Sequence, residues 1–175
     1  LLTAAFLSSS PGRAAGPTLL FDPMTGNVLS QDRAGEPWYP ASLTKLMTAY
    51  IVFEKLRSRE ITLEEKVAVS AMANAQPPSQ IGVPVGGTIT ARIALEAMLV
   101  YSANDMAYGL AEAASGSVPT FAAEMNNRAR DIGMTGTHCV NPNGLHDPLH
   151  ISTARDIGLL ASAMLRDFPE HAHYY

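Results

Sequence analysis

Apolar residues recur at helical spacing from Ser42 to about Arg57, and this stretch has the strongest hydrophobic pattern in the chain. They cover most of the circumference of the predicted helix instead of one stripe. The apolar positions are Leu43, Leu46, Met47, Ala49, Tyr50, Ile51, Val52, Phe53 and Leu56. A helix that is apolar nearly all round is normally buried, so we expect this segment to be a core helix.

Further helices are predicted downstream, and most of them begin at a residue that can cap a helix. We expect Thr90 to cap a helix over residues 91–100 and Gly116 to end a helix over residues 105–114. Ser117 should cap a third helix that runs to Ile132, with Gly133 at its end. Thr153 and Asp156 form a capping-box pattern for a last helix over residues 154–166. Residues 135–151 show no periodicity and are rich in Asn, Gly, Pro and His. The body of the protein is therefore predicted to be mostly helical.

Strand patterns are few. Residues 18–22 and 27–30 flank a turn at 23–26, with proline early and glycine last, and this arrangement predicts a β-hairpin. A short strand around residues 81–85 is expected within the long connection 74–88. A two-stranded hairpin is barely stable alone, so it must pack on the helices or pair with strands that this sequence does not contain. We favour the missing strands.

Composition limits the classes of function. The chain has 175 residues, of which 47% are hydrophobic and 16% charged, enough for one globular core. A net charge of −4 with only three lysines and no basic run gives no footprint for nucleic acid. Cys139 is the single cysteine, so no internal disulfide can form, and we expect it to be a small buried residue.

The N-terminal segment is unlike the rest of the chain. Residues 1–7 are mostly apolar, and they run into a stretch rich in small residues that ends at Gly16, as in a signal-peptide cleavage region. We interpret residues 1–16 as the remnant of an export signal or a disordered tail, and 17–175 as an incomplete catalytic domain. Export would place the protein in the periplasm or cell envelope. No apolar run reaches the length of a membrane span, and a C-terminal membrane anchor stays possible.

Candidate chemistry begins with Ser42 and Lys45. They are three residues apart, so on a helix they lie one turn apart on the same face. Lys45 would be a cation near the start of a buried helix, where burial and the positive helix end both disfavour its charge. A neutral lysine can take a proton from a neighbouring serine. The alternative is a helix-capping serine beside a lysine that extends to water.

A second candidate pair is Ser102 and Asn104, in the predicted loop between two helices. The serine could relay a proton between Lys45 and a leaving group. The asparagine could donate to a substrate carbonyl and accept from a substrate amide. The alternative is a capping serine followed by an asparagine tolerated in a turn.

Together these motifs and their order resemble the serine penicillin-recognising enzymes, and within them the D-alanyl-D-alanine carboxypeptidases, the low-molecular-mass penicillin-binding proteins. The resemblance covers roughly residues 18–168. It rests on residues 21–29 (FDPMTGNVL), 39–49 (YPASLTKLMTA), 99–105 (LVYSAND), 126–129 (NNRA), 133–137 (GMTGT) and 141–145 (NPNGL). It implies an α/β (α+β) fold of the β-lactamase/transpeptidase type, with a helical body and the N-terminal hairpin of an antiparallel sheet whose C-terminal strands are missing here.

The resemblance also implies a role for each matched residue. Ser42 would attack the carbonyl of the penultimate D-alanine of a peptidoglycan stem peptide and form an acyl-enzyme, with Lys45 as general base. Ser102 would pass the proton to the departing D-alanine, and Asn104 would bind the peptide. The backbone N–H of Ser42 would supply half of an oxyanion hole, and β-lactam antibiotics should acylate Ser42. No cofactor and no metal are implied.

One part of the family pattern is absent from this sequence. The family's third motif, Lys-Thr-Gly, would supply a cation and a second oxyanion donor, but both Thr-Gly pairs here, at Thr25 and Thr135, follow a methionine. Losing one oxyanion donor costs about 10²–10³ in rate. We attribute the absence to truncation and expect the 175-residue chain to be inactive, or nearly so, by itself.

Two other functions remain open. A class A β-lactamase would need a glutamate to activate the deacylating water, and Glu124 is the nearest candidate, although it falls inside a predicted helix. A non-catalytic penicillin-fold binding protein would keep the helical body without the lysine strand.

Two further residue sets favour structural roles. His138, Cys139, His146 and His150 match no common zinc spacing, so a polar loop whose groups are satisfied locally is favoured over a metal site. The methionines expected to fill the core are Met72, Met98, Met106, Met125 and Met164.

Overall fold

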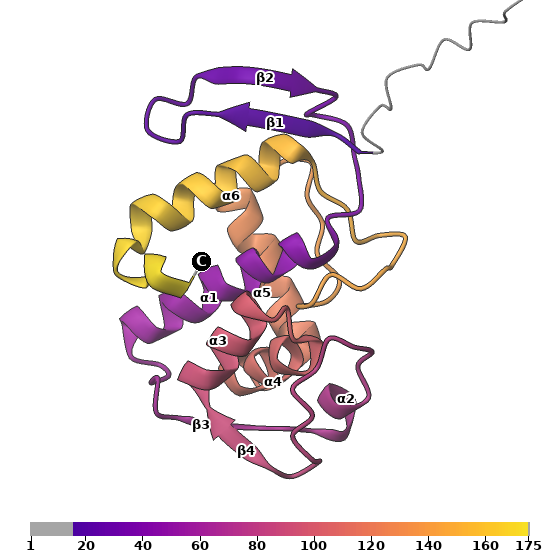
Figure 1. Ribbon diagram of the computed structural model, residues 1–175, viewed down its shortest axis with the longest axis vertical. Helices are drawn as coiled ribbons and strands as arrows, with labels where there is room; N and C mark the ends of the chain where they lie inside the picture. The colour runs from indigo at the N-terminus through magenta and orange to yellow at the C-terminus, as the bar shows by residue number, and fades with distance from the viewer. Residues whose placement is uncertain (1–15, 175) are drawn as a thin grey trace, which may run out of the picture.

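The computed structural model describes residues 16–174, so the segment interpreted as an export signal lies almost wholly outside the described residues. The elements in chain order are β1 (Thr18–Phe21), β2 (Val28–Asp32), the 3₁₀ helix η1 (Ala41–Leu43), α1 (Thr44–Ser58), β3 (Lys66–Ala68), α2 (Ala71–Asn74), β4 (Thr88–Thr90), α3 (Ala91–Val100), α4 (Asn104–Ser115), α5 (Val118–Asp131), α6 (Ala154–Asp167) and the 3₁₀ helix η2 (Pro169–Tyr174). The helices form the body, with the β1–β2 hairpin at one end and the short β3–β4 pair at the other (Figure 1).

Helix α1 is the centre of the core, as its apolar pattern predicts. It contacts α3, α4, α5 and α6, and its residues from Thr44 to Phe53 are buried except Leu46. Leu43, which we expected on the same apolar stripe, lies in η1 and is 52% exposed. The other large side chains that are almost completely buried are Phe121, Phe168, Leu95, Met98, Met106, Leu110, Met125, Met134, Leu160 and Met164.

Four of the five methionines predicted to fill the core do so, and Met72 does not. Met72 lies in α2, a four-residue surface helix, and its side chain is 62% exposed. A helix of one turn presents too little surface to bury every apolar side chain that it carries.

The predicted helix starts are confirmed in the structure. Thr90, Ser117 and Thr153 each accept a hydrogen bond from the backbone N–H three residues on. Asp156, the predicted partner of Thr153 in a capping box, has another use. Its carboxylate accepts hydrogen bonds from the backbone N–H of Gly136, at 2.8 Å, and from the Thr137 hydroxyl, at 2.9 Å, so it ties α6 to the preceding loop.

The strand expected at residues 81–85 is wrong. That segment is irregular, because the N–H groups of Ile81 and Gly82 donate to the Asp105 carboxylate instead of to a neighbouring strand. The antiparallel pair is formed by β3 and β4, which register Val67 opposite Ile89.

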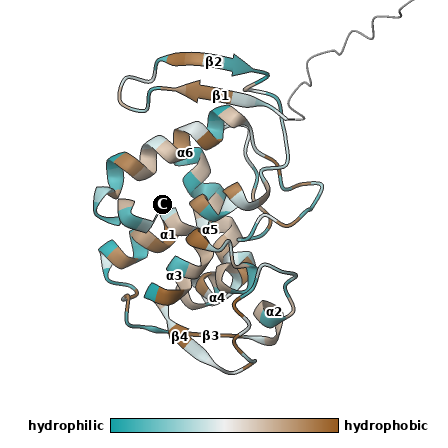
Figure 2. Ribbon diagram, viewed as in Figure 1, coloured by the Kyte–Doolittle hydropathy of each residue, from teal (hydrophilic) through white to brown (hydrophobic). Residues whose placement is uncertain are grey.

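The β1–β2 hairpin packs on α6 (Figure 1). Gly158 permits this approach, because a Cβ atom there would lie 3.0 Å from Leu19 and 3.2 Å from Phe21. Figure 2 shows hydrophobic and hydrophilic residues alternating along α6, whereas β1 and the start of β2 are hydrophobic. Leu20 and Leu29 of the hairpin remain mostly exposed. The hairpin is thus supported by a helix, and the idea that further strands continue its sheet stays a prediction.

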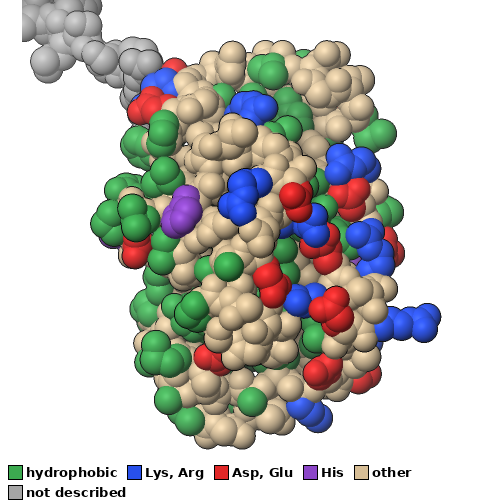
Figure 3. Space-filling view, turned by 180° about the vertical axis from the view of Figure 1, so that it is seen from behind, with side chains coloured by type: hydrophobic (Ala, Val, Ile, Leu, Met, Phe, Trp, Pro, Cys, Tyr) green, Lys and Arg blue, Asp and Glu red, His purple; other side chains and the backbone are tan. Residues whose placement is uncertain are grey.

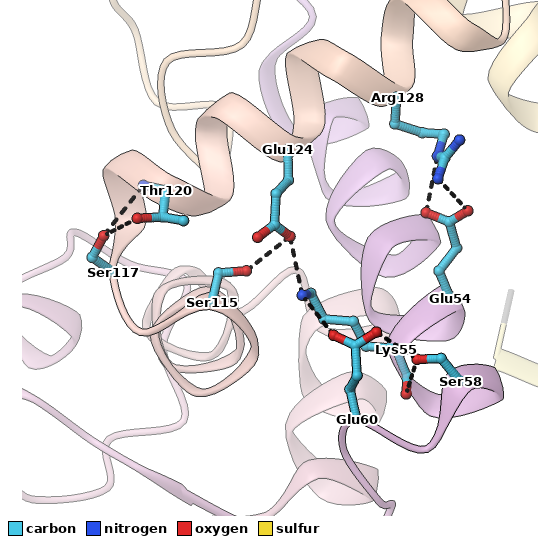
Figure 4. A network of polar contacts seen from close by, with 9 residues as sticks. All are labelled: Glu54, Lys55, Ser58, Glu60, Ser115, Ser117, Thr120, Glu124 and Arg128. Carbon is cyan, nitrogen blue, oxygen red and sulfur yellow. Dashed lines mark hydrogen bonds and ion pairs between the residues drawn. The ribbon is translucent and has the colours of Figure 1, made fainter.

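Charged side chains join α1 to α5 at the surface. The Lys55 ammonium lies 3.3 Å from Glu60 and 3.2 Å from Glu124, and Arg128 lies 2.8 Å from Glu54 (Figure 4). Figure 3 shows acidic and basic side chains interspersed on the rear face of the molecule. Such partly exposed pairs contribute at most about 1 kcal/mol each, so they position the two helices more than they stabilise the fold. Among the described residues, no helix is both long and apolar enough to cross a bilayer.

The burial pattern predicts unequal effects of two substitutions. Phe53 is completely buried in α1. Phe53→Ala should lower the free energy of unfolding by about 3–5 kcal/mol, because the cavity left behind cannot collapse fully. The exposed Met72→Ala should change it by less than about 0.5 kcal/mol. Urea denaturation of both variants tests this, and similar losses for the two would contradict the assignment of the core.

Candidate active site

Ser42 lies in the 3₁₀ turn that leads into α1, and Lys45 lies in the first turn of that helix. The predicted pairing is present in the structure: the Lys45 Nζ atom is 3.2 Å from the Ser42 Oγ atom. Residues three apart eclipse one another in a 3₁₀ turn, so this local geometry directs both side chains to the same side. Ala41, just before the serine, has a left-handed backbone with φ of 48°.

Ser102 reaches Ser42 from the junction between α3 and α4. Its hydroxyl donates to the Ser42 Oγ atom across 3.0 Å, although the two residues are 60 positions apart. Ser102 also has a left-handed backbone, with φ of 60°. Left-handed conformations cost a residue that is not glycine of the order of 1 kcal/mol, and they persist where the surrounding structure enforces them. The junction between the two helices therefore fixes the Ser102 hydroxyl beside Ser42.

Lys45 is almost completely buried, with 3% of its surface exposed. Burial lowers the pKa of its amine from 10.5 to about 8. Its other two partners are neutral oxygens: the side-chain oxygen of Asn104 at 2.8 Å and the backbone carbonyl of Asn143 at 3.0 Å. None of these partners carries a negative charge. The cost of removing an ammonium ion from water at this position is therefore not offset by a counter-charge.

Asn104 does not lie in a loop, as the sequence suggested, but is the first residue of α4, and it is 6% exposed. Its side-chain oxygen accepts from Lys45, and its Nδ2 atom donates to the carbonyl of Pro77 at 2.9 Å. Its backbone N–H donates to the carbonyl of Ser79 at 2.7 Å. Asn104 therefore holds the lysine and the 77–79 segment in place, and one Nδ2 hydrogen is not used in these contacts.

Sequence reasoning missed the contribution of residues 142–144. The Asn143 carbonyl contacts Lys45, and the Pro142 carbonyl accepts from the Thr48 hydroxyl at 2.7 Å. Gly144 has a φ of 80°, and a Cβ atom there would lie 1.8 Å from the backbone oxygen of Ala41, so only glycine fits. A backbone carbonyl leaves no side-chain signature, and the match of residues 141–145 to the family gave no role to any of them.

A cleft of about 330 Å³ opens on Ser42. It is lined by Tyr39, Pro40, Ala41, Ser42, Pro78, Ser79, Ser102, Asn104, Asn143, Gly144, Leu145, His146 and His150. On the other side of Ser42 a more apolar hollow of about 350 Å³ lies between Leu43, Leu46, Met98 and Leu99. The serine is thus accessible at the meeting point of a polar and an apolar surface.

Glu124, the candidate for a deacylating base, is not among the residues that line this cleft. Its carboxylate accepts from the Ser115 hydroxyl at 2.9 Å and pairs with Lys55 in the network between α1 and α5 (Figure 4).

The histidine-rich loop has separate partners for each of its imidazole rings. His146 packs edge-on against Tyr39 with ring centroids 4.6 Å apart, and His138 bonds to the carbonyl of Leu149. The His150 ring is buried against Thr44. Cys139 is buried as expected, and burial raises the pKa of its thiol to about 12. Within residues 16–174 no three His, Cys, Asp or Glu side chains are grouped so that they could hold a metal ion.

Comparison with known proteins gives the same family that the motifs indicate. The family model of the D-alanyl-D-alanine carboxypeptidases, peptidase family S11, matches residues 4–175. The D-alanyl-D-alanine carboxypeptidase DacF of Bacillus subtilis is 33% identical over 159 residues, which cover 91% of this chain and 41% of that protein. The chain therefore spans about two-fifths of the length of this relative.

Solved structures agree in fold. The crystal structure of the D-alanyl-D-alanine carboxypeptidase DacD from Francisella tularensis has a TM-score of 0.89 and 31% identity, covering 100% of this chain and 42% of that one. Penicillin binding protein 5 from Haemophilus influenzae has a TM-score of 0.89 and 31% identity, covering 95% of this chain and 49% of that one. The predicted fold class is thereby confirmed. The chain belongs to the D-alanyl-D-alanine carboxypeptidase family.

Proposed function

We propose that this chain carries the nucleophile and the base of a serine-type D-Ala-D-Ala carboxypeptidase that removes the terminal D-alanine from peptidoglycan stem peptides and is acylated by β-lactams. One observation carries the proposal: Ser42 Oγ has Lys45 Nζ at 3.2 Å on one side and Ser102 Oγ at 3.0 Å on the other. Family membership supports the substrate class, and the name of the Haemophilus relative supports penicillin binding.

The hydrogen bonds of Lys45 explain how it would act as a base. A neutral amine has two N–H donors and one lone pair. The acceptor oxygens of Asn104, at 2.8 Å, and Asn143, at 3.0 Å, can take both hydrogens. The lone pair is then directed at the third neighbour, the Ser42 hydroxyl, whose proton it can remove as the oxygen attacks.

The remaining steps follow from the position of Ser102. The Ser42 oxygen bonds to the carbonyl carbon of the penultimate D-alanine, and the amine of the last D-alanine leaves with a proton. Ser102 lies within hydrogen-bond distance of Ser42 and can pass that proton from Lys45 to the leaving group. The backbone N–H of Ser42 would supply half of the oxyanion hole, and Asn104 would donate its remaining amide hydrogen to the peptide. Water then releases the shortened peptide.

This activity would place the protein where its substrate is, in the periplasm or cell envelope, in agreement with residues 1–16 as the remnant of an export signal. Residues 17–175 would form part of a transpeptidase-like catalytic domain. The absence of a Lys-Thr-Gly sequence leaves the cation of the carboxylate site and the second oxyanion donor to be supplied from outside this chain.

Covalent labelling tests the nucleophile. The product of the whole reading frame that contains this chain should bind a fluorescent penicillin for many minutes, and Ser42→Ala should abolish the label because the acylated oxygen is lost. The control, Ser58→Ala, removes an exposed hydroxyl at the far end of α1 and should leave labelling intact. Label that persists in Ser42→Ala would refute the assignment, rapid loss of label would indicate a β-lactamase, and no label at all in the unaltered protein would indicate a binding protein.

The lowered pKa of Lys45 predicts the pH dependence of acylation. The base acts when neutral, so the rate at low penicillin concentration should rise about tenfold per pH unit below pH 8 and level off above it. Lys45→Arg should lower the rate by about 10²–10⁴, because a guanidinium does not lose its proton in this range. Lys66→Arg, an exposed control, should leave the profile unchanged. A flat profile from pH 6 to 9 would argue against a lysine base.

The 175-residue chain alone should turn over a D-Ala-D-Ala peptide at least about 10²-fold more slowly than the whole product, because one oxyanion donor is missing from it. Release of D-alanine by the two purified proteins, at equal concentration, measures this. Equal turnover would show that the missing motif is dispensable.

A further inference from the structure

His150 is a buried group for which the reaction described above has no role. His150 is 2% exposed, and its Nε2 atom lies 2.8 Å from the hydroxyl of Thr44, the first residue of α1. Thr44 is itself only 3% exposed. This contact connects positions 106 residues apart, directly beside Lys45.

The surroundings of the ring define its tautomer. The other ring nitrogen, Nδ1, lies 3.0 Å from the backbone nitrogen of Val140 and 3.4 Å from that of Asn141. A backbone N–H can only donate, so Nδ1 must be the unprotonated acceptor. Nε2 then carries the proton of a neutral imidazole and donates it to the Thr44 hydroxyl.

The segment held by Nδ1 is the one that reaches the catalytic lysine. After Val140 and Asn141 the chain places the Pro142 carbonyl on the Thr48 hydroxyl and the Asn143 carbonyl on Lys45 Nζ. The segment thus contacts Lys45 and Thr48 directly, and His150 adds a contact with Thr44 in the first turn of the same helix. The histidine is the side chain that binds both partners, because one nitrogen faces the helix and the other faces the segment.

We propose that His150 is a positioning residue of this site: it joins Thr44 to residues 140–143 and thereby keeps the Asn143 carbonyl on Lys45, so that the lone pair of the amine is directed at Ser42. The proposal rests on the function proposed above. If the Asn143 carbonyl moves away, one N–H of the neutral lysine loses its acceptor, and the amine can rotate that hydrogen towards the serine.

A second proton on His150 would break this arrangement, because an Nδ1–H would face two N–H donors. Burial lowers the pKa of the imidazole from its ordinary value of 6.5. The nearby charged and titratable groups act in opposite directions: Asp147 favours protonation, whereas His138 opposes it. The lowered pKa means that the neutral tautomer prevails at neutral pH, where the site would work.

Two substitutions, each of which keeps one of the two ring contacts, separate the functions of the two nitrogens; we call them the half-variants. His150→Asn can keep the acceptor near Val140 and loses the donor to Thr44, whereas His150→Gln can keep the donor and loses the acceptor. We expect each to slow penicillin acylation by between about tenfold and a hundredfold, the cost of a misplaced catalytic group. Thr44→Val should slow acylation to a similar extent. Thr44→Ser should leave the rate close to that of the unaltered protein, because serine keeps the hydroxyl. The double variant with Thr44→Val and His150→Asn should acylate no more slowly than either single variant, because both changes remove the same contact between Thr44 and His150.

The pH profile adds a readout that a merely structural role would not move. Acylation by the unaltered protein should fall more steeply below the pKa of His150 than the titration of Lys45 alone requires, and His150→Asn should remove this extra step. His173→Asn, the same change at an exposed histidine of η2, is the matched control and should alter neither rate nor profile. Unchanged acylation in both half-variants and in Thr44→Val would overturn the proposal.

Nuclear magnetic resonance of the same protein keeps this test independent of activity. The ¹⁵N pattern of His150 should be that of a neutral ring protonated at Nε2, and the titration midpoint of the Lys45 amine should shift in both half-variants but not in His173→Asn. A ring protonated at Nδ1, or a Lys45 midpoint unchanged in both half-variants, would overturn the role of His150. If the unaltered protein binds no penicillin, the proposed function fails, while these two measurements still decide the role of His150.

Discussion

The arrangement around Ser42 is built on the burial of one amine without a counter-charge. Lys45 lies 3% exposed in the central helix, and its partners are a hydroxyl, an amide oxygen and a backbone carbonyl. Burial lowers its pKa from 10.5 to about 8, so at neutral pH the folded protein must either hold an unfavourable cation or release its proton. That shift corresponds to ~3 kcal/mol of stability lost at neutral pH relative to an exposed lysine. The unfolded chain binds the proton more tightly, so this loss disappears as pH rises from about 8 towards 10.5.

The rest of the fold supplies the three groups that surround this amine. The 3₁₀ turn before α1 presents Ser42, and Asn104 at the start of α4 presents its side-chain oxygen, while Ser102 beside it contacts Ser42. The 142–144 segment presents a carbonyl against the same helix. Three backbone positions in this region, Ala41, Ser102 and Gly144, have positive φ, two of them without the freedom of glycine. Local backbone strain of this kind is typical of functional sites whose geometry is enforced by the surrounding packing.

Sequence reasoning predicted those parts that leave a periodic or side-chain signature. The apolar circumference of the 42–57 segment predicted its burial, and the caps at Thr90, Ser117 and Thr153 predicted where three helices begin. Spacing alone predicted that Ser42 and Lys45 meet. One failure concerns a distant partner: residues 81–85 form no strand because the Asp105 carboxylate binds their backbone. The other concerns helix length: Met72 is exposed because α2 is too short to bury it. The contact of the Asn143 carbonyl with Lys45 could not be predicted, since it joins segments 98 residues apart, and the tautomer of His150 depends on how an irregular loop folds back on its ring.

The proposed chemistry requires that the ammonium form of Lys45 is acidic enough to lose its proton near pH 8. Titration of the Lys45 side chain by ¹³C and ¹⁵N resonances, in the protein without ligand, measures this directly. The account predicts a midpoint of about 8 for Lys45 and the loss of that titration in Lys45→Arg. A midpoint at the ordinary value of 10.5 would contradict it, because the neutral amine that takes the proton of Ser42 would then be about 300-fold rarer at neutral pH.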